Sequence, residues 1–235
     1  MDLGPCVSTE ATGKSQAPHT GTTIVAVSFD GGVVLGADGR VSTGTYISNR
    51  ASNKIQQLTD NVFLLRSGSA ADTQAIGDYV RYFAEQLACE LGAPPSVATV
   101  AKLVSTMNYQ NKEMLMGAMI VAGYDEQQGG QVYGCPIGGT LVREQWAVDG
   151  SGSTYIWAAL DDAFKEGMTR KEAEALVVDA LSLAMARDAS SGGIIRTVTL
   201  DKTGAHVRYI GGSDVPTWFE DLPAPNAAAA GMAVG

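Results

Sequence analysis

A glycine–threonine junction, Gly21-Thr22, opens the first apolar segment of this chain. Residues 22–28 are mostly apolar or β-branched, and the turn Phe29-Asp30-Gly31-Gly32 separates them from a second such segment at 33–38. This pattern predicts a β-hairpin. If the Gly21–Thr22 bond is cut, Thr22 becomes a chain end with a hydroxyl and an α-amine on one carbon. Because an α-amine titrates at about 8, this single residue would supply both a nucleophile and a base.

Taken alone, the junction is more often a tail that meets an ordinary edge strand. Residues 1–21 are rich in Gly, Ser, Thr and Pro and have no apolar periodicity, so we expect them to be flexible. We expect the same of the Ala- and Pro-rich tail at 223–235. The residues downstream of Thr22 therefore decide between the two interpretations.

Composition limits the classes of protein to be considered. With 235 residues and 45% hydrophobic side chains, the chain can bury the core of one domain. A net charge of −9 argues against binding to nucleic acid or to an anionic membrane. The apolar runs are much shorter than the roughly 20 residues of a membrane span, and the N-terminus lacks the pattern of an export signal.

Cysteine and histidine are scarce. Cys6, Cys89 and Cys135 form no CxxC pair, and they fit buried thiols in a reducing compartment better than a disulfide framework or a zinc site. With His19 and His206 as the two histidines, a His-dependent triad or a His-ligated metal site is hard to assemble. We therefore expect no metal.

The order of the predicted elements indicates an α+β fold. Strand patterns occur at 54–58, 62–67, 117–124, 131–135, 141–148, 194–200 and 205–210. Helical patterns cover 76–91 and 97–107, then 156–164, and a fourth helix begins at the capping box Thr169-x-x-Glu172. Two pairs of helices that alternate with antiparallel strands predict two sheets packed face to face with helices outside them.

Two charged residues are candidate partners of Thr22. Asp38 ends the second strand of the hairpin, and Lys54 opens the next strand. An ammonium between Asp38 and the Thr22 hydroxyl would stabilise a developing alkoxide and keep the α-amine unprotonated. Each residue alone is more often a strand-end cap or a solvated charge.

Two loops contribute further candidates. Gly150-Ser151-Gly152-Ser153 leads into the third helix, where a hydroxyl and adjacent amides could bind an anion. Asp188 and Ser191 follow the fourth helix, before Gly192-Gly193, which allows the backbone to turn back. Taken singly, both loops are more often helix caps.

Together these motifs resemble the catalytic β subunits of the eukaryotic proteasome, which are N-terminal nucleophile hydrolases. The resemblance covers about residues 20–222. It rests on Gly21-Thr22-Thr23-Ile24, Gly36-Ala37-Asp38-x-Arg40, Asn49-Arg50 with Lys54, Arg66-Ser67-Gly68-Ser69-Ala70-Ala71-Asp72, Gly150-Ser151-Gly152-Ser153, and Arg187-Asp188 with Ser191-Gly192-Gly193. One such motif is weak evidence, whereas six in the family's order are strong evidence.

The resemblance implies a four-layer αββα sandwich and a defined site. Residues 1–21 would be a propeptide removed by self-cleavage at Gly21-Thr22, residues 22–222 the hydrolase domain, and 223–235 a tail. Thr22 would be the nucleophile, and its partners would be Asp38, Lys54, Ser151 (or, less favoured, Ser153), Asp188 and Ser191. The Gly68 amide would stabilise the oxyanion. A glycine before Thr22 leaves room for the strained turn that self-attack requires.

Arg66 bears on specificity. An arginine here looks like the caspase-like, beta-1 type, in which a guanidinium would pair with an acidic P1 side chain; an intersubunit ion pair is the alternative. Ser42 and Ala70 would also line the substrate site. The family commonly has Asp-Ser-Arg-Thr-Thr where this chain has Asp38-Gly39-Arg40-Val41-Ser42, and Asn53 stands where an aspartate often precedes the lysine, so specificity beyond P1 stays open.

The implied partners are the other β subunits and the α ring of a four-ring α7β7β7α7 core in cytoplasm and nucleus, its regulatory particle, and polypeptide substrates. No cofactor is implied for peptide cleavage. Two other classes stay open: a non-catalytic β subunit of the same particle, and a different self-processing amidohydrolase. The bacterial two-ring relative also begins with Thr-Thr, but it is shorter and would not account for Arg66 or for long third and fourth helices.

Overall fold

The first sheet carries the predicted N-terminal hairpin at its centre. A computed structural model describes residues 21–218. The first sheet has the strand order β10 (Trp146–Asp149), β1 (Ile24–Phe29), β2 (Gly32–Asp38), β11 (Ile195–Asp201) and β12 (Gly204–Ile210). All of its pairings are antiparallel. β1 is thus hydrogen-bonded on both edges, which fixes the strand that Thr22 precedes.

The second sheet packs face to face on the first. Its order is β5 (Ile55–Thr59), β6 (Val62–Gly68), β7 (Gly117–Asp125), β8 (Gly129–Cys135) and β9 (Val142–Glu144). These pairings are antiparallel too. Apolar side chains such as Ile24, Leu35, Leu65, Ile120 and Val198 fill the space between the two sheets.

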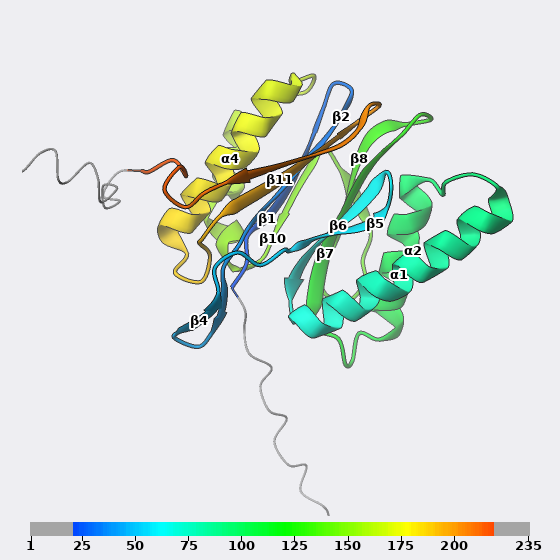
Figure 1. The fold of residues 1–235 in the computed structure, drawn as a ribbon, viewed down its shortest axis with the longest axis horizontal. Coiled ribbons are helices and arrows are strands. Elements are labelled where there is room, and N and C mark those ends of the chain that lie inside the picture. The colour runs from blue at the N-terminus through cyan, green and yellow to red at the C-terminus, as the bar shows by residue number, and fades with distance from the viewer. Residues whose placement is uncertain (1–20, 219–235) are drawn as a thin grey trace, which may run out of the picture.

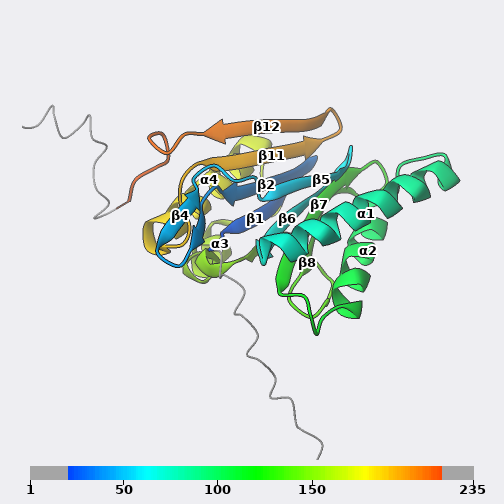
Figure 2. The same ribbon diagram turned by 60° about the horizontal axis from the view of Figure 1, so that its bottom comes forward.

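Helices cover the outer faces of both sheets (Figure 1). α1 (Ala70–Leu91) and α2 (Val97–Gln110) pack on the second sheet, and α3 (Trp157–Ala163) and α4 (Arg170–Arg187) lie on the first. Figure 2 shows the same layers from below, with β12 at the outer edge of its sheet. The predicted α+β class and four-layer αββα sandwich are therefore confirmed.

Local sequence signals explain where the helices begin. The hydroxyls of Ser69 and Ser96 accept hydrogen bonds from backbone amides in the first turns of α1 and α2. Thr169 and Glu172 form both hydrogen bonds of the predicted capping box. α1 ends at Gly92, which adopts a left-handed conformation.

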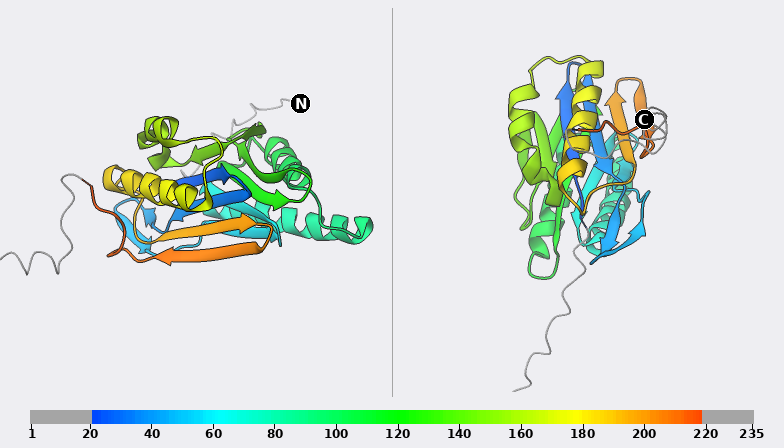
Figure 3. Two further views of the ribbon diagram at one scale, coloured as in Figure 1. Left: turned by 90° about the horizontal axis from the view of Figure 1, so that it is seen from above. Right: turned by 90° about the vertical axis from the view of Figure 1, so that its left-hand side faces the viewer.

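Three expectations about the elements were wrong. The single strand predicted at 141–148 is two strands, because the chain leaves the second sheet after β9 and enters the first as β10. Figure 3 shows the first sheet from two further sides, with the orange strands β11 and β12 side by side. A small hairpin, β3 (Val41–Thr43) with β4 (Tyr46–Asn49), was not predicted. The third helix is short: a 3-10 turn at Ser151–Tyr155 precedes α3, which has 7 residues. Of the two helices that were expected to be long, only α4 is, with 18 residues.

Some expectations concern features at or beyond the limits of the described chain. Apart from Gly21, the expected propeptide and all of the tail at 223–235 lie outside the described residues, as does Cys6. Cys135 is buried as expected, whereas Cys89 is exposed. Within residues 21–218 no helix is long and apolar enough to cross a bilayer. The same residues contain no cluster of three or more His, Cys, Asp or Glu side chains suited to a metal ion.

Candidate active site

Strand register brings the candidate residues to one end of the first sheet. Ile24 pairs with Ala37 on one side and with Asp149 on the other. The residues that continue these strands, Asp38 and Gly150, therefore flank the Thr22–Thr23 segment. β11 begins beside Asp38, which brings the loop after α4 to the same place.

Asp38 and Lys54 form an ion pair in which both side chains are buried. Lys54 Nζ lies 2.7 Å from Asp38 Oδ1, with side-chain exposures of 7% and 0%. Asp38 also accepts hydrogen bonds from the backbone amides of Thr23, Arg40 and Gly192 at 2.9, 3.1 and 3.0 Å. Four donors thus fix the position of the carboxylate, and the carboxylate fixes the ammonium in turn.

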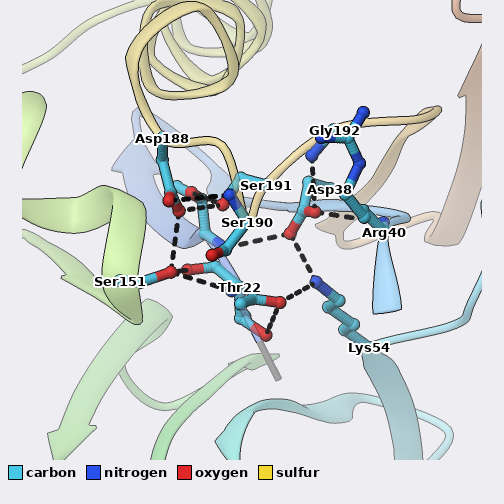
Figure 4. A network of polar contacts seen from close by, with 11 residues as sticks. Thr22, Asp38, Arg40, Lys54, Ser151, Asp188, Ser190, Ser191 and Gly192 are labelled. Carbon is cyan, nitrogen blue, oxygen red and sulfur yellow. Dashed lines mark hydrogen bonds and ion pairs between the residues drawn. The ribbon is translucent and has the colours of Figure 1, made fainter. Parts of the chain in front are cut away.

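The same ammonium contacts the bond that self-cleavage would break. Lys54 Nζ donates to the Gly21 carbonyl oxygen at 3.0 Å, and the Thr22 hydroxyl donates to that oxygen at 2.7 Å (Figure 4). The sequence-based expectation put Lys54 between Asp38 and the Thr22 hydroxyl. With Gly21 attached, the lysine instead bridges Asp38 and the Gly21 carbonyl, where it can stabilise negative charge on the carbonyl oxygen.

Burial changes the protonation of Lys54. Desolvation lowers the pKa of its ammonium below the ordinary 10.5, although the Asp38 carboxylate raises it. The group is therefore more easily deprotonated than a solvated lysine.

Ser151, Asp188 and Ser191 form a hydrogen-bonded network on the other side of Thr22. Ser151 Oγ accepts from the Thr22 backbone nitrogen at 3.1 Å and donates to Asp188 Oδ2 at 2.7 Å. Ser191 Oγ donates to the same oxygen at 2.6 Å. Ser153 is different, because its hydroxyl donates to the Gly150 carbonyl within its own turn. The geometry thus distinguishes Ser151 from Ser153.

Two cavities adjoin Thr22. The first holds about 40 Å³ and is lined by Thr22, Lys54, Arg66, Gly68 and Ala70 together with Val41, Ser52, Asn53 and Thr73. Arg66 and Ala70 thus lie where expected, whereas Ser42 is buried and does not line this cavity; its neighbour Val41 does. Gly68, the predicted oxyanion residue, lines both cavities together with Thr22.

The guanidinium of Arg66 makes only long hydrogen bonds to the described residues. It donates to Ala70 O at 3.5 Å and to Asn53 O at 3.3 Å, and its buried Nε has no partner among the described residues. Burial lowers the pKa of Arg66 from its ordinary value, while Asp78 raises it. A cation in this state favours an incoming anion.

Sequence reasoning did not assign roles to two residues that support the site, Thr23 and Arg40. Thr23 Oγ1 lies 2.8 Å from Ser191 Oγ, which joins the two sides of the network. Arg40 donates to the Ala189 carbonyl at 2.8 Å and lies over Gly192, where a Cβ would come within 2.5 Å of the guanidinium carbon. The glycine pair after Ser191 was the available signal for this close approach.

Comparison with known proteins agrees with this geometry. Residues 18–200 match the family described as "Proteasome subunit". The chain belongs to the proteasome subunit family.

Individual proteasome subunits are similar over most of their length. The chain is 51% identical over 211 residues to "Proteasome subunit beta type-6" of Arabidopsis thaliana, which covers 89% of this chain and 91% of the relative. It is 49% identical over 189 residues to "Probable proteasome subunit beta type-1" of Schizosaccharomyces pombe, covering 80% and 84%. It is 45% identical over 208 residues to "Proteasome subunit beta type-9" of Mus musculus bactrianus, covering 88% and 94%. The relatives are thus β-type subunits.

Proposed function

We propose that this chain is a catalytic, threonine-type endopeptidase subunit of the 20S proteasome core. The observation that carries the proposal is the position of Lys54, which is paired with buried Asp38 and donates to the Gly21 carbonyl beside the Thr22 hydroxyl. Burying an ammonium costs free energy, and a subunit without catalytic activity would gain no function from an ammonium at this position.

The first reaction would be self-cleavage. Thr22 Oγ adds to the Gly21 carbonyl carbon, and Lys54 stabilises the oxyanion. The Gly21–Thr22 C–N bond then breaks as the proton lost by the hydroxyl is taken up by the Thr22 nitrogen. The products are a free Thr22 amine and an ester between Gly21 and the Thr22 oxygen. Water hydrolyses this ester, so that residues 1–21 leave as a propeptide with a C-terminal carboxylate and Thr22 keeps its hydroxyl and gains an α-amine.

Peptide hydrolysis would reuse the same groups. The Thr22 hydroxyl passes its proton to the α-amine and attacks the substrate carbonyl, and the Gly68 amide stabilises the oxyanion. The new ammonium protonates the departing amine, and water hydrolyses the acyl ester. Ser151, which donates to Asp188, orients the Thr22 α-amine. The positive charge of Lys54 would lower the pKa of that α-amine.

We further propose cleavage after acidic residues, the caspase-like specificity of a beta-1 type subunit. Arg66 supports this because its guanidinium lines the cavity beside Thr22 and its Nε makes no hydrogen bond to any residue of 21–218. A P1 carboxylate could form the charge-assisted hydrogen bonds that Arg66 lacks. Ala70 would form part of the same subsite, whereas Ser42 is buried in β3 and does not line it.

We propose that the chain works in the α7β7β7α7 core, with other β subunits and an α ring as neighbours and with regulatory particles acting through the complex. The process would be ubiquitin-dependent degradation of polypeptides, in the cytoplasm and the nucleus. The hydrolase domain would span 22–222, followed by the tail at 223–235. Peptide cleavage would need no cofactor.

Two other functions predict different outcomes. A non-catalytic β subunit would keep Met1 or Asp2 at its start in the assembled particle. A different self-processing amidohydrolase would expose Thr22 but would act on small amides, so a threonine-directed proteasome inhibitor would leave its activity intact.

N-terminal sequencing and intact mass of this subunit in purified, fully assembled particles test the proposal. We expect Thr22 as the first residue in wild type and an unprocessed chain in Thr22→Ala. A leader that is still attached in active particles would overturn the proposal.

A further inference from the structure

The two cavities beside Thr22 carry opposite charges. Side chains of β6 alternate between its faces, so Arg66 contacts Ala70 of α1 whereas Ser67 contacts Asp149 of β10. The second cavity holds about 250 Å³ and includes Ser67, Ile137, Asp149, Ser151 and Ser190. Of the described residues that line it, Asp149 is the one that bears a charge.

Asp149 is fixed by one of its oxygens. Its Oδ1 accepts hydrogen bonds from Ser67 Oγ at 2.9 Å and from the Gly150 amide at 2.6 Å. Its Oδ2 makes no hydrogen bond within the part of the chain that the structure describes. The side chain is half-buried and lines the second cavity.

The second cavity lies where the amine product of peptide cleavage departs. The Thr22 nitrogen, which protonates that amine in the proposed mechanism, is held by Ser151, and both residues line this cavity. If the P1 side chain occupies the cavity of Arg66, the residue after the scissile bond therefore falls on the side of Asp149. Self-cleavage would remove Gly21, which also lines this cavity.

We propose that the second cavity is the S1′ subsite, which binds the P1′ residue of the substrate, and that Asp149 selects a lysine or arginine at P1′. The inference rests on the proposed function. Its volume of about 250 Å³, against about 30 Å³ for a water molecule, accommodates a long side chain, and Ile137 offers an apolar surface for the methylene stem. With Arg66 on the other side, the site favours a bond that joins an acidic residue to a basic one.

The experiment compares internally quenched peptides that share an acidic P1 residue and differ at P1′, with Lys, Gln or Glu. Assembled particles are used, and cleavage at the chosen bond is quantified by mass spectrometry after subtraction of the rate in Thr22→Ala particles. In wild type we expect kcat/KM for P1′ Lys to exceed that for P1′ Glu by at least about fivefold, with a smaller ratio at high salt.

Asp149→Asn separates charge from structure. An asparagine oxygen can still accept from Ser67 and Gly150, so the link between the sheets is kept while the charge is lost. We expect the Lys/Glu ratio to fall to about one, and Asp162→Asn, an exposed charge change on α3, to keep the wild-type ratio. If Asp149→Asn particles do not assemble, two other measurements decide. Asp149→Glu keeps the charge and should keep a Lys/Glu ratio above one, and the wild-type ratio should fall at high salt; a ratio that salt leaves unchanged would contradict the inference.

A Lys/Glu ratio within about twofold in wild type, or one that persists in Asp149→Asn, would overturn the inference. A fluorogenic amide with an acidic P1 residue and no P1′ amino acid reports the proposed function independently. If that amide is cleaved by Thr22 and the ratio is flat, the P1′ inference alone is wrong. If it is not cleaved, the proposed specificity has failed instead.

Discussion

Lys54 donates to Asp38 at 2.7 Å and to the Gly21 carbonyl at 3.0 Å, so one buried ammonium links the carboxylate at the end of β2 to the peptide bond ahead of β1. β1 and β2 are paired strands, which fixes the distance between Asp38 and the junction. The lysine is therefore positioned by the sheet before any leader is removed.

The first prediction concerns pH. Because burial lowers the pKa of Lys54 below 10.5, the unfolded chain binds more protons than the folded chain between the lowered pKa and 10.5. Through this group, the free energy of unfolding therefore rises with pH in that window. Activity changes in the opposite direction, since deprotonation removes the cation. We expect kcat/KM for an acidic-P1 amide to fall on the alkaline side at a pH below 10.5.

Lys54→Arg tests whether Lys54 causes this fall in kcat/KM at alkaline pH, which is the alkaline limb of the pH profile. A guanidinium keeps its proton throughout this range, so any residual activity of the variant should lack the limb. A limb of the same position in Lys54→Arg would mean that another group titrates.

The second prediction concerns the buried pair. Lys54→Met leaves the Asp38 carboxylate buried without its counter-charge, a change that costs about 3–5 kcal/mol. We expect the low end, because three backbone amides still donate to Asp38. Urea unfolding of the full-length chain measures the loss, and Asp38→Asn combined with Lys54→Met should recover part of it. Additive losses would contradict this coupling.

The third prediction separates two neighbouring serines. Ser151→Ala removes the link between the Thr22 nitrogen and Asp188, so we expect kcat to fall by about 10- to 100-fold, the equivalent of one charge-assisted hydrogen bond. Ser153→Ala is the matched control, because within residues 21–218 its hydroxyl hydrogen-bonds only to the Gly150 carbonyl of its own turn. Equal effects of the two substitutions on kcat in assembled particles would refute the assignment.

The fourth prediction concerns the leader junction. At Gly21 a Cβ would lie 1.9 Å from Ser190 Cβ, so Gly21→Ala should displace the scissile bond and slow the appearance of Thr22 at the chain start. Gly134→Ala adds a methyl group with nothing within 4 Å and should be processed normally. A chain that begins at Thr22 after cleavage of an N-terminal ubiquitin fusion should restore activity. Normal processing of Gly21→Ala would show that the close approach is not needed.

The fifth prediction concerns P1 specificity. Arg66→Met should abolish cleavage after Asp or Glu while Thr22 is still exposed, and Arg66→Lys should retain part of the activity because it keeps the charge but loses the planar fork. Arg81→Met, which removes a hydrogen bond to the Gln57 carbonyl far from Thr22, is the control. Cleavage of acidic-P1 peptides by Arg66→Met at the wild-type rate would disprove the role of Arg66.

The parts of this molecule that follow a simple period could be predicted from sequence. The alternating residues at 22–38 specify the first hairpin, and its pairing necessarily brings Asp38 to Thr22. The run at 141–148 has strand character throughout, but nothing in it states that the chain changes sheets after Glu144. The β3–β4 hairpin is too short to produce a period.

Side-chain direction within turns was beyond the sequence. Ser151 and Ser153 lie two residues apart in one 3-10 turn, and the direction of each hydroxyl is set by the backbone of that turn. The contact between Ser67 and Asp149 joins different sheets and residues far apart along the chain. Only the packing of the two sheets against each other reveals it.

The position of β1 between β10 and β2 also determines what happens to the end that self-cleavage would create. New termini usually fray, yet the residues after Thr22 are held by ladders on both edges, and the Thr23 amide and hydroxyl bind Asp38 and Ser191. Loss of the leader would thus leave the amino group anchored, and the enzyme would become active without having to refold.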